Sequence, residues 1–139
     1  LEARAHMMSA AAMGATAFQK GLGAIHAMSH PVGAVFNTHH GTTNAVCMPA
    51  VLAFNADTIR GRFDQAAAYL GIDGGFDGFC EFVQQFNDSF AIPRTLTEMG
   101  VSEDRLDDLV AMALEDPSCG GNPVELTADG LRGLFRACF

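Results

Sequence analysis

Residues 21 to 56 read GLGAIHAMSHPVGAVFNTHHGTTNAVCMPAVLAFNA, a stretch of 36 residues without a single Asp, Glu, Lys or Arg. The same stretch carries four of the five histidines of the chain, namely His26, His30, His39 and His40. A segment this poor in charge is expected to be buried, and a buried imidazole costs free energy unless its nitrogens are bound. We therefore predict that residues 21–56 form the innermost or cleft-facing part of the domain.

The spacing of these histidines is typical of a metal site. His26 and His30 are four residues apart, so on a helix they share one face. His40 follows after a Pro, a Gly and an Asn, which let the chain turn back toward them. Spacing alone therefore pairs His26 with His30 as ligands in an apolar cleft. The alternative, which spacing leaves open, is that single histidines are core residues bonded to backbone carbonyls, or that they cap helices.

The remaining sequence predicts an all-α domain. Apolar residues recur at helical spacing and no stretch alternates with a period of two. We expect helices at residues 2–20, 24–36, 42–54, 57–70, 76–90 and 106–114, and a last one after residue 127. The expected caps are Thr42 or Thr43, Asp57, Ser102 and Thr127. In the last helix, Leu131, Leu134 and Phe135 should face inward. Four phenylalanines at helical spacing are predicted to be core residues: Phe76, Phe79, Phe82 and Phe86.

Composition limits the class of protein. Residues 1–55 hold one acid and two bases, whereas residues 56–139 hold fifteen acids and six bases, which together give the net charge of −8. An acidic chain without a basic stripe is a poor partner for nucleic acid or an anionic membrane surface. The uncharged stretch is not a membrane span, because its Pro, Asn, Thr and His residues would need partners in hydrocarbon. Four scattered cysteines without a CxxC motif predict a reduced, cytoplasmic protein.

A family resemblance appears in the same uncharged stretch. The segment GLGAIHAMSHPVGA from Gly21 to Ala34, followed by His40-Gly41 and Asn44-Ala45, resembles the signature of the iron-containing (group III) alcohol dehydrogenases. The segments LTEMGV (residues 96–101), Asn122-Pro123 and Leu126-Thr127 follow in family order, so the resemblance covers essentially the whole chain. It implies a helical, bundle-like C-terminal domain of the dehydroquinate synthase-like kind. That domain would hold a divalent metal through one Asp and three His, beside an N-terminal domain that binds NAD(P).

The resemblance assigns roles that differ from the spacing argument. His26 and His40 look like the two later metal ligands, and His30 resembles the residue beside the nicotinamide and the substrate. His30 is therefore the expected catalytic and cofactor-contacting residue, and it could relay a proton. His39 falls at a variable position and is expected in a loop, and His6 is expected to be structural or exposed.

The resemblance also implies that the chain, which starts at Leu1 rather than Met, is the C-terminal part of a longer protein. We expect residues 1–139 to form one metal-binding domain that lacks the dinucleotide-binding domain and is inactive by itself. The parent would transfer hydride between a small alcohol or carbonyl compound and NAD(P), with Fe²⁺ or Zn²⁺ polarising the substrate oxygen, and would form a homo-oligomer. The alternatives are an enzyme domain of the glycerol dehydrogenase or dehydroquinate synthase type, and a non-catalytic helical binding domain with structural histidines.

Overall fold

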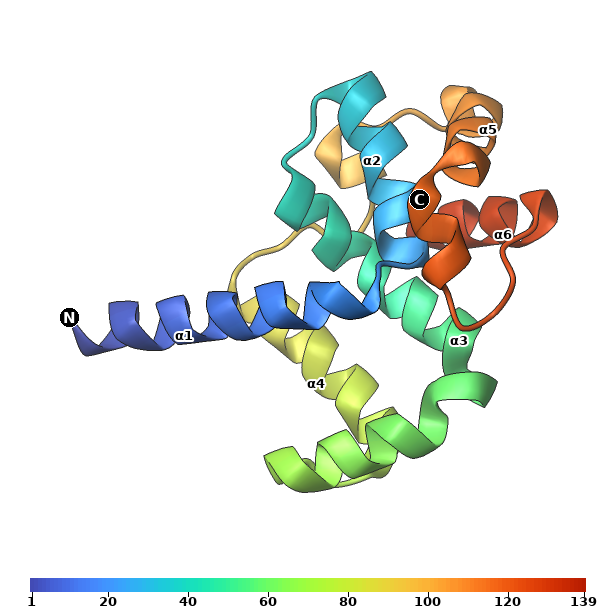
Figure 1. Cartoon of the computed structure of the whole chain (residues 1–139). Helices are drawn as coiled ribbons and strands as arrows, with labels where there is room; N and C mark the ends of the chain where they lie inside the picture. The colour runs from blue at the N-terminus through green and yellow to red at the C-terminus, as the bar shows by residue number, and fades with distance from the viewer.

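The computed structural model describes residues 1–139 and contains helices but no strands, which confirms the all-α class (Figure 1). Six α-helices follow one another along the chain: α1 (Glu2–Ala17), α2 (Ala24–Phe36), α3 (His40–Leu70), α4 (Gly75–Ser89), α5 (Leu106–Glu115) and α6 (Ala128–Cys138). Short 3₁₀ turns lie between them: η1 (Phe18–Lys20), η2 (Thr97–Met99), η3 (Glu103–Arg105) and η4 (Pro117–Gly121). None of the helices is long and apolar enough to cross a membrane.

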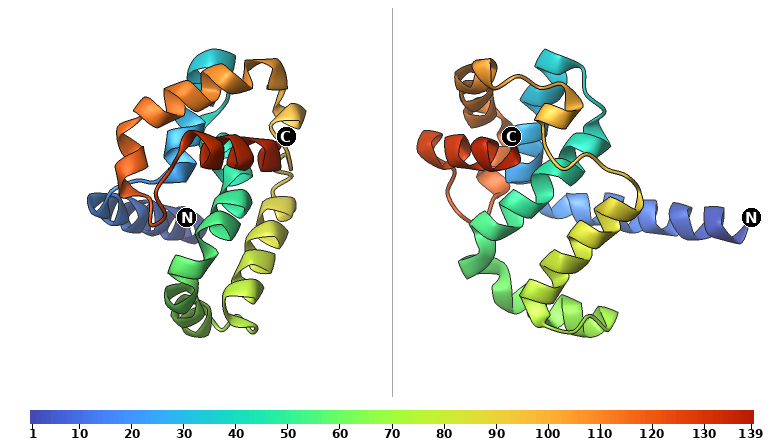
Figure 2. Two further views of the ribbon diagram at one scale, coloured as in Figure 1. Left: turned by 90° about the vertical axis from the view of Figure 1, so that its right-hand side faces the viewer. Right: turned by 180° about the vertical axis from the view of Figure 1, so that it is seen from behind.

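Helix α3 is the element around which the others are arranged. Helix α2 packs on α3 and α5, and helix α6 packs on α5 and α3. Helix α4 packs antiparallel to α3, with Phe76 at its start beside Asp64 and Asn87 near its end beside Ala45. Helix α1 instead projects from the body of the molecule, as two further views show (Figures 1 and 2), and none of its residues is buried. The half of the molecule that contains α2, α5 and α6 therefore holds most of the packed interior.

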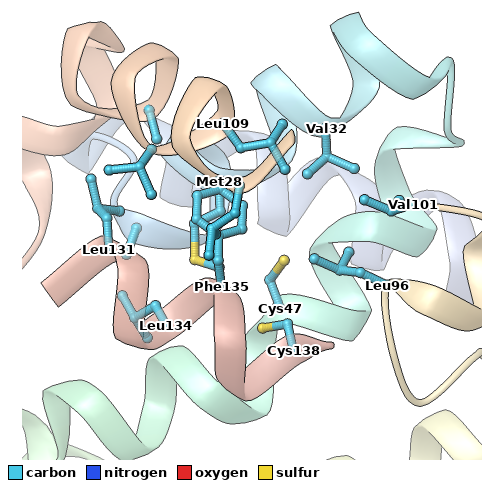
Figure 3. Close-up of a cluster of buried hydrophobic side chains, with 14 of the residues drawn as sticks. Met28, Val32, Cys47, Leu96, Val101, Leu109, Leu131, Leu134, Phe135 and Cys138 are labelled. Carbon is cyan, nitrogen blue, oxygen red and sulfur yellow. The ribbon is translucent and has the colours of Figure 1, made fainter. Parts of the chain in front are cut away.

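The main hydrophobic core lies where α2, α3, α5 and α6 meet (Figure 3). Met28, Leu109 and Phe135 are completely buried at its centre. The inward-facing residues predicted for the last helix, Leu131, Leu134 and Phe135, all belong to this core. Burying each such side chain stabilises the fold by roughly 1.5–3 kcal/mol, so this cluster fixes the positions of α2 and α3 relative to each other.

A smaller core joins the C-terminal part of α3 to α4. It consists of Leu52 and Ile59 from α3 and Phe76 and Val83 from α4. The prediction that all four phenylalanines of α4 are core residues is wrong for two of them, because Phe82 and Phe86 are 42% and 53% exposed. These two rings lie outside the smaller core and next to each other along α4, with centroids 5.8 Å apart.

The predicted break at Asp57 is also wrong. Helix α3 continues from His40 to Leu70, and Asp57 lies exposed within it. A capping residue ends or begins a helix only where the backbone is free to leave it, and no Gly or Pro stands within three residues of Asp57. Thr127 does cap α6, since its hydroxyl accepts a hydrogen bond from the Gly130 N–H at 3.1 Å. The side chain of Ser102, by contrast, makes no capping bond.

Helix α3 contains a proline in its interior. Pro49 has no N–H to donate to the carbonyl of Ala45, one turn earlier. The side-chain amide of Asn87, on α4, donates a hydrogen bond to that carbonyl at 3.1 Å instead. The helix therefore passes through Pro49 without leaving this acceptor unpaired.

The loop after α5 is fastened to the start of α2 by Asn122. Its Oδ1 accepts hydrogen bonds from the backbone N–H of Ala24, at 3.2 Å, and from the amide of Asn55, at 3.0 Å. Its Nδ2 donates to the Asn55 Oδ1 at 2.9 Å. A Cβ atom added to Gly121 would lie 1.9 Å from the carbonyl oxygen of Leu22, so the two backbones meet where only glycine fits.

Residues 21–56 are partly interior, as predicted from their lack of charge. One side of α2 is buried, with Ala27 and Met28 at 0% exposure. The side that carries the histidines is open, and His30, His39 and His40 are all exposed. This side of α2 contains the candidate site.

Candidate active site

The histidines predicted to bind metal or substrate, His26, His30 and His40, lie together. His26 and His30 are one turn apart on α2, and the short turn from Asn37 to His39 returns the chain so that His40 begins α3 beside them. The ring centroids are 5.6 Å apart for His26 and His30, 5.2 Å for His26 and His40, and 5.5 Å for His30 and His40. The left-handed conformation of Asn37, with φ of 53°, makes this reversal possible.

Asn44 shows how two of the rings are oriented. Its amide nitrogen lies 3.0 Å from Nε2 of His40 and 3.4 Å from Nε2 of His26. Where the amide N–H donates to these contacts, the accepting ring nitrogen is Nε2, which leaves Nδ1 as the protonated nitrogen of that ring. The Oδ1 atom of Asn44 is buried and has no hydrogen-bond partner. The Nε2 atoms of His26 and His40 thus both lie close to one atom of Asn44.

The environment of His26 favours its neutral form. Burial, followed by the neighbouring rings of His40 and His30, lowers the pKa of His26 from its ordinary value, against an opposing effect of Asp116. A neutral imidazole is the form that coordinates metal ions. The low pKa therefore keeps His26 available as a ligand near neutral pH.

The third ring has a different partner. Nδ1 of His30 lies 2.8 Å from Oδ2 of Asp116, which stands between α5 and η4. The other oxygen of Asp116 accepts a hydrogen bond from the Ser118 N–H at 2.8 Å. Burial would raise the pKa of Asp116, but the hydrogen bonds from Ser118 and His30 outweigh it, so the pKa lies below its ordinary value. The result is an ionised carboxylate directed at one edge of His30.

The remaining histidines lie outside this cluster. His39 is the N-cap of α3, where its Nδ1 accepts a hydrogen bond from the Thr42 N–H at 3.3 Å. The predicted caps Thr42 and Thr43 are therefore wrong by three or four residues. His6 lies on the projecting helix α1, with its side chain 78% exposed.

The donor set fits part of a divalent-metal site. Two imidazoles bring their Nε2 atoms close to a common point, and imidazole nitrogen is a ligand that suits Zn²⁺ or Fe²⁺. No group of three or more His, Cys, Asp or Glu side chains in this chain is arranged to hold a metal ion. His26 and His40 are therefore too few by themselves for a site that needs three or four ligands.

An apolar groove of about 430 Å³ reaches from the end of α1 to His26. Phe18 lines it, and the ring of this residue meets His26 edge-on with centroids 5.5 Å apart. Leu52, Ile59 and Phe63 form its apolar wall on α3. The groove gives a small, largely apolar molecule a path to the histidine cluster.

Reasoning from sequence missed two residues of this site. Asp116 lies 86 residues from its partner His30, and although Asp116-Pro117 is a typical helix start, that pattern does not reveal which side chain the carboxylate meets. Asn44 is one turn after His40, and this spacing on a helix is the sequence pattern that indicates a contact between the Asn44 amide and the His40 ring.

Comparison with known proteins gives consistent matches over most of the chain. Residues 1–139 match the family model described as Fe-containing alcohol dehydrogenase family, C-terminal. A 4-hydroxybutyrate dehydrogenase of Cupriavidus necator is 41% identical over 96% of this chain and 37% of its own length. An NAD-dependent methanol dehydrogenase of Bacillus methanolicus is 34% identical over 98% of this chain and 38% of its own.

A solved structure shows the same fold. The crystal structure of a 1,3-propanediol oxidoreductase superposes with a TM-score of 0.79 at 28% identity, over 85% of this chain and 33% of that one. The chain thus spans little more than a third of the length of its relatives. On the family match over its whole length, the chain belongs to the iron-containing alcohol dehydrogenase family, of which it represents the helical C-terminal domain.

Proposed function

We propose that this chain is the metal-binding domain of an NAD(P)-dependent alcohol dehydrogenase that interconverts a small alcohol and its aldehyde or ketone. The observation that carries the proposal is the convergence of the His26 and His40 Nε2 atoms, at 3.4 Å and 3.0 Å from a single atom of Asn44. Support comes from the family match and from relatives named as dehydrogenases.

In this proposal His26 and His40 hold a divalent metal, Fe²⁺ or Zn²⁺, together with an Asp and a His supplied from outside this chain. A metal bound there acts as a Lewis acid on the substrate oxygen, and a nicotinamide accepts or donates the hydride. The groove beside Phe18 would admit the substrate.

His30 is the proposed catalytic residue of this chain, placed beside the substrate and the nicotinamide. Its ring stacks against His40, with centroids 5.5 Å apart and planes 16° apart, and its side chain is 42% exposed. A neutral, partly open imidazole can take the alcohol proton at Nε2 and pass it to solvent. In the reverse direction the same nitrogen returns the proton.

The full-length protein is proposed to be a cytoplasmic homo-oligomer with an additional dinucleotide-binding domain, and residues 1–139 alone to be inactive. The decisive experiment is an assay of the full-length protein with C2–C4 alcohols and NAD(P)⁺, before and after metal removal. We expect turnover that is lost on chelation and restored by Fe²⁺ or Zn²⁺. Turnover that survives complete metal removal would contradict the proposal.

A further inference from the structure

The carboxylate of Asp116 is held in place from both sides. Its Oδ1 accepts the Ser118 N–H and its Oδ2 meets Nδ1 of His30, each at 2.8 Å. The side chain is only 13% exposed, unlike the pair of Arg60 and Asp77, in which the carboxylate is 75% exposed. Exposed pairs of that kind contribute little, because water and ions screen them. The contact between Asp116 and His30 has a defined geometry instead.

The segment that carries Asp116 is attached to the helix that carries His30. Beyond Asp116, Gly121 approaches the backbone of Leu22, and Asn122 accepts the N–H of Ala24 at the start of α2. The segment that carries Asp116 therefore contacts α2 at two places, one beside His30 and one at the beginning of the same helix.

This contact decides which nitrogen of His30 carries the proton. An ionised carboxylate can only accept hydrogen bonds, so Nδ1 of His30 must be the protonated nitrogen. In the neutral ring the lone pair then lies on Nε2. Nε2 is thus the available base of His30.

We propose that Asp116 is a positioning residue that holds His30 in its Nδ1–H tautomer, so that Nε2 receives the proton of the alcohol substrate. The inference rests on the proposed function for its catalytic part, whereas the tautomer itself is a property of this chain. It goes beyond the metal ligands, because the side-chain partner of Asp116 in the cluster is His30, and Asp116 makes no hydrogen bond to either proposed ligand. Carboxylates that orient an imidazole in this way act on the rate rather than on binding.

The test uses Asp116→Asn, because the remaining hydrogen bond predicts its effect. If Oδ1 of the new amide keeps accepting the Ser118 N–H, its NH₂ group faces Nδ1 of His30 and must donate to it. The ring is then forced into the opposite tautomer, with the proton on Nε2. Asp116→Glu is the conservative variant that restores an acceptor, and Asp77→Asn is the control that removes an equal charge from an exposed pair on α4.

The first measurement is two-bond ¹H–¹⁵N correlation NMR of the imidazoles in residues 1–139, with His30 assigned from its loss in His30→Gln. We expect a protonated Nδ1 in the native chain and in Asp77→Asn, a protonated Nε2 in Asp116→Asn, and partial return of the native pattern in Asp116→Glu. A native His30 with its proton on Nε2, or a tautomer unchanged in Asp116→Asn, would overturn the inference.

The second measurement is steady-state kinetics of the full-length protein with metal content determined in parallel. Asp116→Asn should lower kcat by about 100-fold or more, with KM for the alcohol and bound metal nearly unchanged, and Asp77→Asn should be neutral. Loss of metal, or an unchanged kcat in a variant whose tautomer is reversed, would overturn the positioning role. An inactive wild-type protein would overturn the proposed function, while the NMR result would still decide whether Asp116 sets the proton on His30.

Discussion

The amide nitrogen of Asn44 lies 3.0 Å from Nε2 of His40, one turn earlier on the same helix, and shares this approach with Nε2 of His26 on α2. A single side chain therefore bridges the two helices at the point where a metal ion would bind. Because the amide donates a hydrogen bond but has no charge, it aligns the two imidazoles without becoming a strong ligand itself.

Replacing Asn44 with Asp should convert this bridge into a third metal ligand. We expect residues 1–139 with Asn44→Asp to bind Zn²⁺ or Co²⁺ about tenfold more tightly or better than the native chain, because a carboxylate joins two imidazoles at one point. Isothermal titration calorimetry measures this, with Gln65→Glu, the same change of amide to carboxylate at an exposed position of α3, as the control. Equal affinities in Asn44→Asp and the native chain would show that the two Nε2 atoms do not share a site.

Substitutions of the three clustered histidines should separate their roles in the full-length protein. His26→Ala and His40→Ala each remove a proposed ligand, so bound metal and turnover should fall together. His30→Ala should keep the metal while turnover falls by about 100-fold. Metal analysis alongside rate decides the matter, and His39→Ala, which removes only a cap, serves as the control. Metal loss in His30→Ala with retention in His40→Ala would reverse the assignment.

The hydrogen bonds exchanged by Asn55 and Asn122 should couple the contributions of these two residues to the free energy of unfolding. The two amides exchange hydrogen bonds at 3.0 and 2.9 Å, and Asn122 also accepts the Ala24 N–H. Each Asn→Ala change should lower the free energy of unfolding by roughly 2 kcal/mol, because it leaves partly buried groups unpaired. A double-mutant cycle in urea should give a coupling energy of about 1 kcal/mol. Strict additivity would mean that the exchange contributes nothing beyond burial.

The lowered pKa of Asp116 predicts a pH dependence of stability. A carboxyl group whose folded pKa is below its unfolded pKa stabilises the fold fully above the unfolded value, here 3.8, and loses that contribution as the pH falls through the folded value. The difference in unfolding free energy between the native chain and Asp116→Asn should therefore be constant at neutral pH and shrink below about pH 4. Urea titrations between pH 3 and pH 7 measure it, and a difference that grows as the pH falls would contradict the assignment.

Sequence patterns predicted most of the helices because their signals are local. Ala24–Phe36 was predicted with its observed bounds, since Gly23 and Asn37 mark its two ends. The ends of α3 were harder to predict. Asp57 carries a capping signal at an exposed position inside a continuous helix, and nothing local distinguishes a usable cap from one that the chain passes by. The exposure of Phe82 and Phe86 depends on which face of α4 packs against α3, and the sequence of α4 does not contain that information.

The site was predictable to the extent that its members are neighbours along the chain. His26, His30 and His40 fall within fifteen residues, and both the spacing and the family pattern brought them together. Asp116 could not be found in this way, because its contact with His30 depends on how the segment after α5 packs against α2. Their partnership is a product of tertiary structure, and a single sequence contains no signal for it.

Pro49 has a consequence for the order in which the domain can assemble. In an isolated α3 the carbonyl of Ala45 would have only water as a partner, because the residue that should pair with it is an imino acid. Water can be expelled from that carbonyl only after Asn87 has arrived with α4. Because Pro49 supplies no donor, this part of α3 completes its hydrogen bonding within the protein only when α4 has packed against it. Helix α3, which begins with His40 of the candidate site, thus depends for one of its hydrogen bonds on α4, which contributes no side chain to that site.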